Sequence, residues 1–248
     1  MKLFLDTTIQ IDRIFGSHKR KMAIHKICAG KECCCTTYVL GEFYATIMRD
    51  VVTIYHVLLR ESDLNEAERL VAELMRDRHA GRAHKIFICL RELYDNNLEQ
   101  MKCEVESYLE DLLYMFYRGI DSDLSDKTQC QRGRAQIIYN DGIPILSGAG
   151  CQKSDCQCDI VKFWKSHQAL LDGASFPATL GERVGKLLAQ IGNPNYDVKG
   201  NNCRTLGDSV IVLEALDHEG AVCTTNRNDY EPLCELFQVT LYVPDYKS

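Results

Sequence analysis

The two ends of the chain share one pattern, in which a short apolar run is followed by a segment with helical spacing. Residues 2–5 predict a short buried strand, and Thr7 or Thr8 favours the start of a helix directly after it. A second apolar run at residues 33–37 precedes a helix that we expect from residue 39 to about residue 48. Strands that alternate with helices in this way are typical of a parallel α/β sheet.

The C-terminal end repeats the pattern. We expect a helix at residues 206–217 that stops at Gly220, followed by a strand at residues 221–225. A short helix from about Asp229 then leads into a last strand at residues 239–243. The sequence therefore predicts an α/β fold whose central parallel sheet is built from both chain ends.

The middle of the chain has a different character. Apolar positions recur at helical spacing, with charged residues on the other face, in three successive segments: residues 65–79, 84–97 and 98–117. We interpret these segments as a helical layer. A cysteine-bearing stretch follows up to Asp159, and a further helix is expected at residues 180–191. A strand between the two halves of the sheet is also expected, and residues 86–90 and 143–146 both fit one.

These patterns divide the chain into three parts. Residues 1–54 and 179–248 are predicted to form the α/β core, and residues 55–178 a helical and cysteine-containing insertion within it. A chain of 248 residues is long enough to bury a self-sufficient core together with such an insertion. The insertion could shape substrate choice, replace an inhibitory or regulatory protein partner, or form a homo-oligomer interface, and the sequence leaves these roles open.

The composition is that of an ordinary globular protein. A hydrophobic fraction of 46% and a charged fraction of 26% indicate neither disorder nor a membrane span. The apolar start at residues 3–5 is interrupted by Asp6 and is too short for a signal peptide, so we expect a cytoplasmic protein. The 13 cysteines are then expected to be reduced thiols, and their odd number leaves at least one unpaired.

The formal net charge of −6 argues against a surface that binds through positive charge throughout. A nucleic-acid partner would have to contact local patches. Three clusters of basic residues qualify: Lys19, Arg20 and Lys21; residues 76–85; and Arg132 with Arg134. Each such cluster is more often a solvated face.

Four acidic residues stand out by their positions relative to the predicted strands and helices. Asp6 follows the first strand, and ligands bind outside the carboxyl ends of strands in open α/β sheets. Glu42 lies at the margin of an apolar helix face, where a buried charge needs a partner or a cation. Asp208 opens a helix after Gly207, which allows close backbone approach, and Asp229 follows a strand by a short turn. Taken alone, such carboxylates also fit a helix cap, a charge at a helix N-terminus or a turn.

The segments that carry these acids form a recognisable series: LFLDTT at residues 3–8, TTYVLGEF at 36–43, LGDSVI at 206–211 and TTNRNDY at 224–230. In this order they resemble the four motifs of the PIN-domain family of nucleases. The first is similar to the family's hydrophobic strand that ends in aspartate and then threonine or serine, and the second to its glutamate-bearing helix. The resemblance covers the two chain ends and implies a PIN-like three-layer fold.

The resemblance also implies an activity, that of a metal-dependent endoribonuclease that hydrolyses phosphodiester bonds in single-stranded or structured RNA. Family members bind Mg²⁺ or Mn²⁺ through these acids, which implies Asp6 and Asp208 as central ligands and Glu42 and Asp229 as residues that complete the site. The fourth motif often has aspartate where this chain has Asn226. The metal role is therefore open between Asp229, Asn226 and both.

The chemistry of these groups fits that activity. Carboxylates are hard oxygen ligands for Mg²⁺, and a bound ion lowers the pKa of its water and neutralises charge on a phosphate. Thr7, Thr225 and Asn226 would position water or phosphate. The expected products carry 5′-phosphate and 3′-hydroxyl ends.

Two alternatives stay open. One is a catalytically silent PIN-like module that binds or scaffolds, in which the insertion does the work, although the presence of all four acids counts against it. The other is a structure-specific DNA nuclease, which we rank below RNA cleavage because that class usually carries more acidic residues.

Four cysteines of the insertion form a candidate zinc site: Cys130, Cys151, Cys156 and Cys158. They lie in a polar, glycine-containing stretch, and four soft ligands could hold a structural Zn²⁺ that folds it. The spacing is not that of a standard zinc knuckle, and free cysteine is also a common buried apolar residue. A doubly covered parallel strand would bury Cys33, Cys34 and Cys35 as small hydrophobes.

Overall fold

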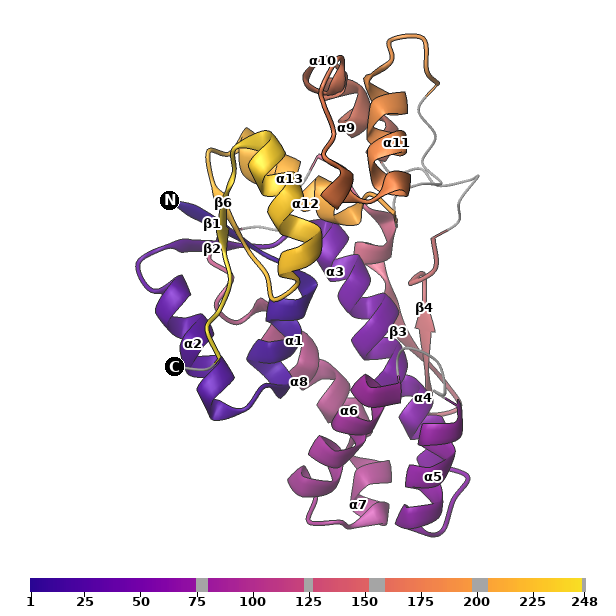
Figure 1. Ribbon diagram of the computed structural model, residues 1–248. Helices are drawn as coiled ribbons and strands as arrows, with labels where there is room; N and C mark the ends of the chain where they lie inside the picture. Colours follow the sequence, from indigo (N-terminus) through magenta and orange to yellow (C-terminus); the bar gives the residue numbers. More distant parts are fainter. Residues whose placement is uncertain (75–79, 123–126, 152–158, 198–204, 247–248) are drawn as a thin grey trace.

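The computed structural model describes residues 1–74, 80–122, 127–151, 159–197 and 205–246 (Figure 1). Within them, the central sheet has four strands: β1 (Lys2–Leu5), β2 (Glu32–Cys34), β5 (Ala221–Cys223) and β6 (Thr240–Tyr242). All neighbours are parallel, in the order β2-β1-β5-β6. The predicted α/β fold with a parallel sheet from both chain ends is confirmed.

Strand β1 joins the two halves of the chain. Leu3 pairs with Cys33 of β2 on one side and with Ala221 of β5 on the other. Neither segment that was expected to supply a strand between the halves joins this sheet, because residues 86–90 lie in a helix and residues 143–146 in a separate hairpin. That prediction is wrong, since a short apolar run does not distinguish a strand from a buried helical segment.

Four core helices follow the strands in the predicted places: α1 (Thr7–Phe15), α3 (Thr37–Phe43), α12 (Gly207–Asp217) and α13 (Arg227–Phe237). A fifth helix, α2 (His18–Cys28), was not predicted. Helix α3 extends further than predicted. It continues through the π-helical turn η1 (Tyr44–Met48) into α4 (Arg49–Leu58). The predicted division at residue 54 therefore falls inside a continuous helical segment.

Both faces of the sheet are covered. On one face the ring of Phe4 stacks on His218, directly after α12, with ring centroids 5.7 Å apart. On the other face Cys33 of β2 interacts with Cys28 at the end of α2. A strand that is buried on both faces carries a continuous apolar run, which is why these strands were visible in the sequence. Cys33, Cys34 and Cys35 are buried, as predicted.

The middle of the chain is mainly helical, with α5 (Leu64–Leu74), α6 (Ala80–Leu93), α7 (Leu98–Cys103), α8 (Val105–Tyr117), α9 (Ile160–Ser166), α10 (Gln168–Leu171), α11 (Glu182–Gly192) and the 3-10 helices η2 (Gln131–Arg134) and η3 (Ala178–Leu180). The predicted helical layer is confirmed. Helix α8 packs against the core through Phe116, whose ring centroid lies 4.9 Å from that of Phe43 on α3. No helix in the described ranges is long and apolar enough to cross a membrane.

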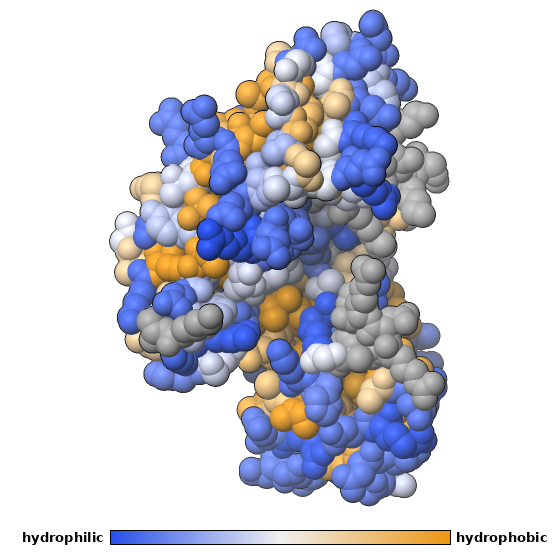
Figure 2. Space-filling view, viewed as in Figure 1, coloured by the Kyte–Doolittle hydropathy of each residue, from blue (hydrophilic) through white to orange (hydrophobic). Residues whose placement is uncertain are grey.

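A hairpin of β3 (Gln136–Asn140) and β4 (Ile143–Ser147) lies against α4, where Nε2 of His56 is 2.9 Å from the carbonyl oxygen of Pro144. On the face shown in Figure 2, the surface is hollowed between the part that carries α13 and the helical layer below it. Hydrophilic residues cover much of the surface around this hollow.

Candidate functional site

Asp6 ends strand β1 and begins helix α1. Its carboxylate accepts hydrogen bonds from three hydroxyl groups, at 2.7 Å from Thr8, 2.8 Å from Thr224 and 2.8 Å from Tyr230. The backbone N–H of Thr8 lies 3.4 Å from the same carboxylate, so Asp6 is also the N-cap of α1. Asp6 is 4% exposed, and the three hydroxyl donors offset the cost of burying its charge.

Three further acids reach this region from separate helices. Glu42 on α3 accepts a hydrogen bond of 2.6 Å from Oγ1 of Thr7, the residue next to Asp6. Asp208 lies in the first turn of α12 and Asp229 in the first turn of α13. Burial, followed by the charges of Asp6, Glu42 and Asp229, raises the pKa of Asp208 to about 7. We call these four residues the acid cluster.

The charges of the acid cluster also act on Glu42. Burial and the charge of Asp6 raise the pKa of Glu42, while the hydroxyl of Thr7 and the guanidinium of Arg132 act in the opposite direction. The four acids that the sequence singled out therefore lie close together, because the charges of the other three act on Asp208 and that of Asp6 acts on Glu42. Perturbed carboxylates of this kind gather at functional sites.

The fourth motif contributes a hydrogen-bonded pair. The side-chain amide of Asn226 donates to the exposed carboxylate of Asp229 at 2.6 Å. The backbone N–H of Asn226 donates to Thr224 Oγ1 at 2.9 Å, and that of Thr225 donates to Thr8 Oγ1 at 3.2 Å. The turn is thus fixed to the hydroxyl groups that hold Asp6, and Asn226 orients Asp229.

Gly207 makes room for Tyr38 beside the acid cluster. A Cβ atom at this position would lie 2.2 Å from the hydroxyl oxygen of Tyr38. Tyr38 is 2% exposed and its hydroxyl hydrogen-bonds Glu42. The close approach that the sequence predicted at Gly207 is confirmed, and its partner is this ring.

Arg132 reaches the acid cluster from the insertion. It is 6% exposed, and its guanidinium carbon lies 5.2 Å from the centroid of the Tyr38 ring. The sequence grouped Arg132 with Arg134 as a basic patch, and the structure separates them, because Arg134 is exposed. Arg132 does not lie on a solvated face; it is buried beside Tyr38 and Glu42.

The acid cluster is not assembled as a ready metal site. In the part of the chain that the structure describes, no group of three or more His, Cys, Asp or Glu side chains is arranged to hold a metal ion. The carboxylates of Asp6, Glu42 and Asp229 are instead turned toward hydrogen-bond donors. The donor chemistry nevertheless fits Mg²⁺ or Mn²⁺, since all four groups are carboxylates and a cation would relieve their repulsion. Ligation would require them to rotate toward a common point.

The zinc prediction stays open. Cys130 and Cys151 are partly buried, and the backbone N–H of Cys130 donates to Thr37 Oγ1 at 3.1 Å. Cys156 and Cys158 lie outside the described residues.

The first basic patch lies on α2, where Lys19 and Lys21 are exposed. Arg20 is instead paired with Asp12, at 2.8 Å, and its guanidinium carbon lies 4.8 Å from the centroid of the Tyr246 ring. The patch therefore presents Lys19 and Lys21, while Arg20 ties α2 to neighbouring segments.

The second basic patch is described in part, because residues 75–79 lie outside the described ranges. Within the remainder, Arg82 pairs with the buried Asp50 at 2.6 Å. This arginine thus forms an ion pair that joins α6 to α4.

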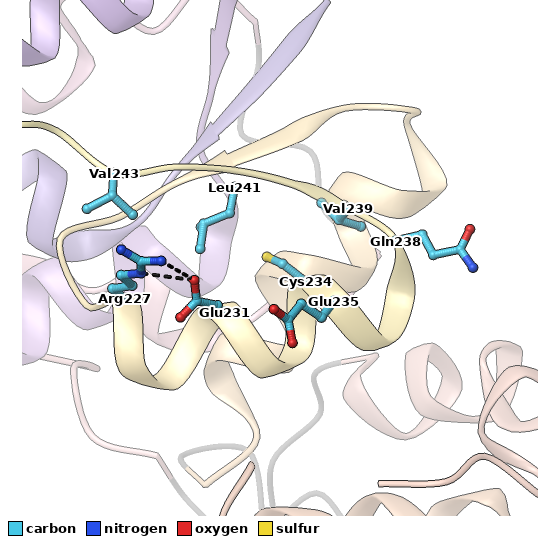
Figure 3. A pocket seen from close by; sticks show the side chains of 8 residues that line it. All are labelled: Arg227, Glu231, Cys234, Glu235, Gln238, Val239, Leu241 and Val243. Atoms are coloured by element: carbon cyan, nitrogen blue, oxygen red, sulfur yellow. Dashed lines mark hydrogen bonds and ion pairs between the residues drawn. The ribbon is translucent and has the colours of Figure 1, made fainter. Parts of the chain in front are cut away.

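The hollow in Figure 3 is distinct from the acid cluster. It lies between α13 and β6, has a volume of about 520 Å³, and is lined by none of the four acids. Nε of Arg227 donates to Glu231 at 2.9 Å on its α13 side, and Leu241 and Val243 line it from the β6 side. It contributes nothing to the chemistry of the acid cluster.

Sequence reasoning missed the hydroxyl groups around Asp6. Thr8, Thr224 and Tyr230 all lie in segments that carry the acids, but Thr224 and Tyr230 were assigned no role and Thr8 was considered only as a helix cap, a place that Asp6 takes. The available signal was the concentration of hydroxyl residues at the carboxyl ends of two strands. The place of Arg132 had no such signal, because it depends on how the insertion packs.

Comparison with models of protein families, with curated proteins and with solved structures finds no match to this chain. The function is therefore inferred from the site itself.

The hydroxyl of Tyr230 gives a first test of the site. The residue is fully buried and donates to Asp6 Oδ1 at 2.8 Å. Tyr230→Phe should lower the free energy of unfolding by about 1–3 kcal/mol, because a buried carboxylate loses a donor. Urea unfolding measures the change, and Tyr114→Phe at a position 65% exposed is the control, with little change expected. Equal effects of the two substitutions would contradict the hydrogen bond.

The crowding of the acids predicts a pH dependence. In the metal-free protein, the free energy of unfolding should fall as the pH rises from about 4 toward 7. The pKa of Asp208 is about 7 in the folded protein and near 3.9 in an unfolded chain, so the folded state holds this proton more tightly. The stability that it contributes is therefore full at low pH and is lost as the pH passes through 7. Unfolding in EDTA across this range, with Asp208→Asn as the comparison, checks the trend; an identical slope in both proteins would exclude Asp208 as its source.

Proposed function

We propose that this chain is a divalent-metal-dependent endoribonuclease with a PIN-like fold. The observation that supports it most is the gathering of four acids from separate segments: Asp6 after β1, Glu42 bonded to the adjacent Thr7, and Asp208 and Asp229 in the first turns of α12 and α13. Burial and the charges of the other three raise the pKa of Asp208 to about 7. A helix cap or a first-turn charge accounts for each acid singly but not for their gathering at one place, and a cation is the ligand that their repulsion favours.

In this proposal Asp6 and Asp208 hold Mg²⁺ or Mn²⁺, and Glu42 and Asp229 complete the site. When bound, the ion supplies an activated water and neutralises charge on the phosphate. The hydroxyl groups around Asp6 and the amide of Asn226 hold Asp6 and Asp229 in the metal-free protein, and these carboxylates would rotate toward the ion when it binds. No His, Ser or Cys nucleophile is needed; attack of water on the phosphorus, with the 3′ oxygen as the leaving group that takes up a proton, would leave 5′-phosphate and 3′-hydroxyl ends.

The test is cleavage by the purified chain of single-stranded RNA, single-stranded DNA and a DNA flap, each with Mg²⁺, Mn²⁺ or EDTA. We expect RNA to be cut with either metal and to stay intact in EDTA. Cleavage confined to the DNA flap would support a structure-specific DNA nuclease. Binding of RNA without cleavage under all conditions would support the silent binding module, which the hydrogen-bonded arrangement of the acids also favours.

Helix α2 is the candidate contact for the nucleic-acid backbone. A hollow of about 530 Å³ lies beside it and is lined by Lys19 and Lys26 among others. Reversing the charges of Lys19 and Lys21 to glutamate should weaken RNA binding about tenfold and flatten its salt dependence, because fewer counterions are released. The same double change at the exposed Lys162 and Lys165 of α9 is the control for net charge. If both double variants bind RNA alike, α2 is a solvated face.

A further inference from the structure

The insertion places a buried cation, Arg132, beside the acid cluster. Arg132 in η2 is 6% exposed and lies over the ring of Tyr38, whose hydroxyl hydrogen-bonds Glu42. The charges of Arg132 and Glu42 interact more strongly in this buried setting than they would in water. Arg132 is therefore placed to change the electrostatics of the site. Under the proposed nuclease activity, this change affects the binding of a metal ion and of a phosphodiester.

The position of Arg132 is fixed by backbone packing. A Cβ atom at Gly41 would lie 2.8 Å from Cβ of Arg132, and one at Gly133 would lie 2.8 Å from the carbonyl oxygen of Thr37. Two glycines therefore allow η2 to lie directly on α3. The backbone N–H of Cys130 donates to Thr37 Oγ1 at 3.1 Å and anchors the start of the same turn. Arg132 is held against the site by its main chain.

The charges at the site have a simple balance. When ionised, the acid cluster contributes four negative charges and Arg132 one positive charge, which leaves a formal charge of −3. A divalent cation that enters is attracted by the carboxylates and repelled by the guanidinium. A phosphodiester carries one negative charge, so the carboxylates repel it and the guanidinium of Arg132 attracts it.

We propose that Arg132 is a positioning residue that sets the charge of the acid cluster. It weakens the binding of a divalent cation in the substrate-free protein and favours the approach of an anionic phosphodiester. The inference rests on the proposed function, because it concerns the same site, and it assigns the insertion a part in that site.

The experiment measures the affinity for Mn²⁺ alone by calorimetry, on the full chain without RNA. Arg132→Met removes the charge and keeps much of the side-chain volume, and we expect about tenfold tighter binding of Mn²⁺. Arg132→Lys keeps the charge and should bind within about threefold of the unaltered protein. Arg134→Met removes an exposed charge from the same turn and is the matched control, with little change expected.

A second variant covers the case in which Arg132→Met does not fold. Gly133→Ala pushes η2 away from Thr37 and keeps the charge of Arg132, so it should also tighten Mn²⁺ binding. A merely structural role of Arg132 would loosen the site and weaken Mn²⁺ binding in both variants, and that result, or unchanged affinity, would overturn the inference. If the unaltered protein binds Mn²⁺ no better than Asp208→Asn does, the proposed function fails instead.

Discussion

Asp208→Asn should abolish cleavage of RNA, with the rate at saturating Mn²⁺ lowered by about a thousandfold or more. A metal ion contributes several kcal/mol of charge stabilisation to such a reaction, and each 1.36 kcal/mol corresponds to a factor of ten in rate. The substitution keeps the shape of the side chain and removes the charge that burial and the other three acids perturb most clearly. Single-turnover cleavage of single-stranded RNA is the measurement.

The fold should survive this change. The carboxylate of Asp208 is repelled by Asp6, Glu42 and Asp229 in the metal-free protein, so its loss should leave the free energy of unfolding at pH 7 unchanged or higher. Asp172→Asn, at an exposed position after α10, controls for the loss of one negative charge and should cleave RNA normally. Near wild-type cleavage by Asp208→Asn at saturating metal would show that the acid cluster is not the active site.

Gly207→Ala should cause a large loss of stability. The added Cβ would lie 2.2 Å from the hydroxyl oxygen of Tyr38 and 2.5 Å from Cζ of its ring, inside a packed region. Either α12 or the ring must move, which we expect to lower the free energy of unfolding by about 2–3 kcal/mol. Urea unfolding gives the change directly.

The same substitution at Gly81 is the matched control. A Cβ atom there would meet nothing within 4 Å, and the residue lies in helix α6. Gly81→Ala should therefore leave the stability unchanged or raise it by up to about 1 kcal/mol, because alanine favours a helix. A loss at Gly81 as large as that at Gly207 would mean that the cost does not come from contact with Tyr38.

Both predictions concern one network. Tyr38 connects Gly207 of α12 with Glu42 of α3 and with Arg132 of the insertion. Moving its ring should therefore alter Mn²⁺ binding as well as stability, whereas the Asp208 substitution should alter Mn²⁺ binding and cleavage without loss of stability. The two variants therefore separate metal binding by the acid cluster from the packing of Tyr38 that holds the cluster in place.

The sequence by itself determined the elements at both chain ends except α2. Strands β1 and β5 are buried on both faces, so their apolar runs are continuous and could be recognised without knowledge of their neighbours. The helices of the middle were recognisable for the same kind of reason, because an apolar stripe with a period of 3.6 residues is a local property. The acids were found because each stands beside such a local signal.

The tertiary structure alone decided what lies next to what. The direct pairing of β1 with β5 depends on contacts between distant parts of the chain, and a short apolar run such as residues 86–90 fits a strand and a buried helix equally well. The burial of Arg132 depends on two glycines, Gly41 and Gly133, that let η2 rest on α3. Burial and the distances between charges are set by the folded chain. The raised pKa of Asp208 and the place of Arg132 could therefore be known only from the tertiary structure.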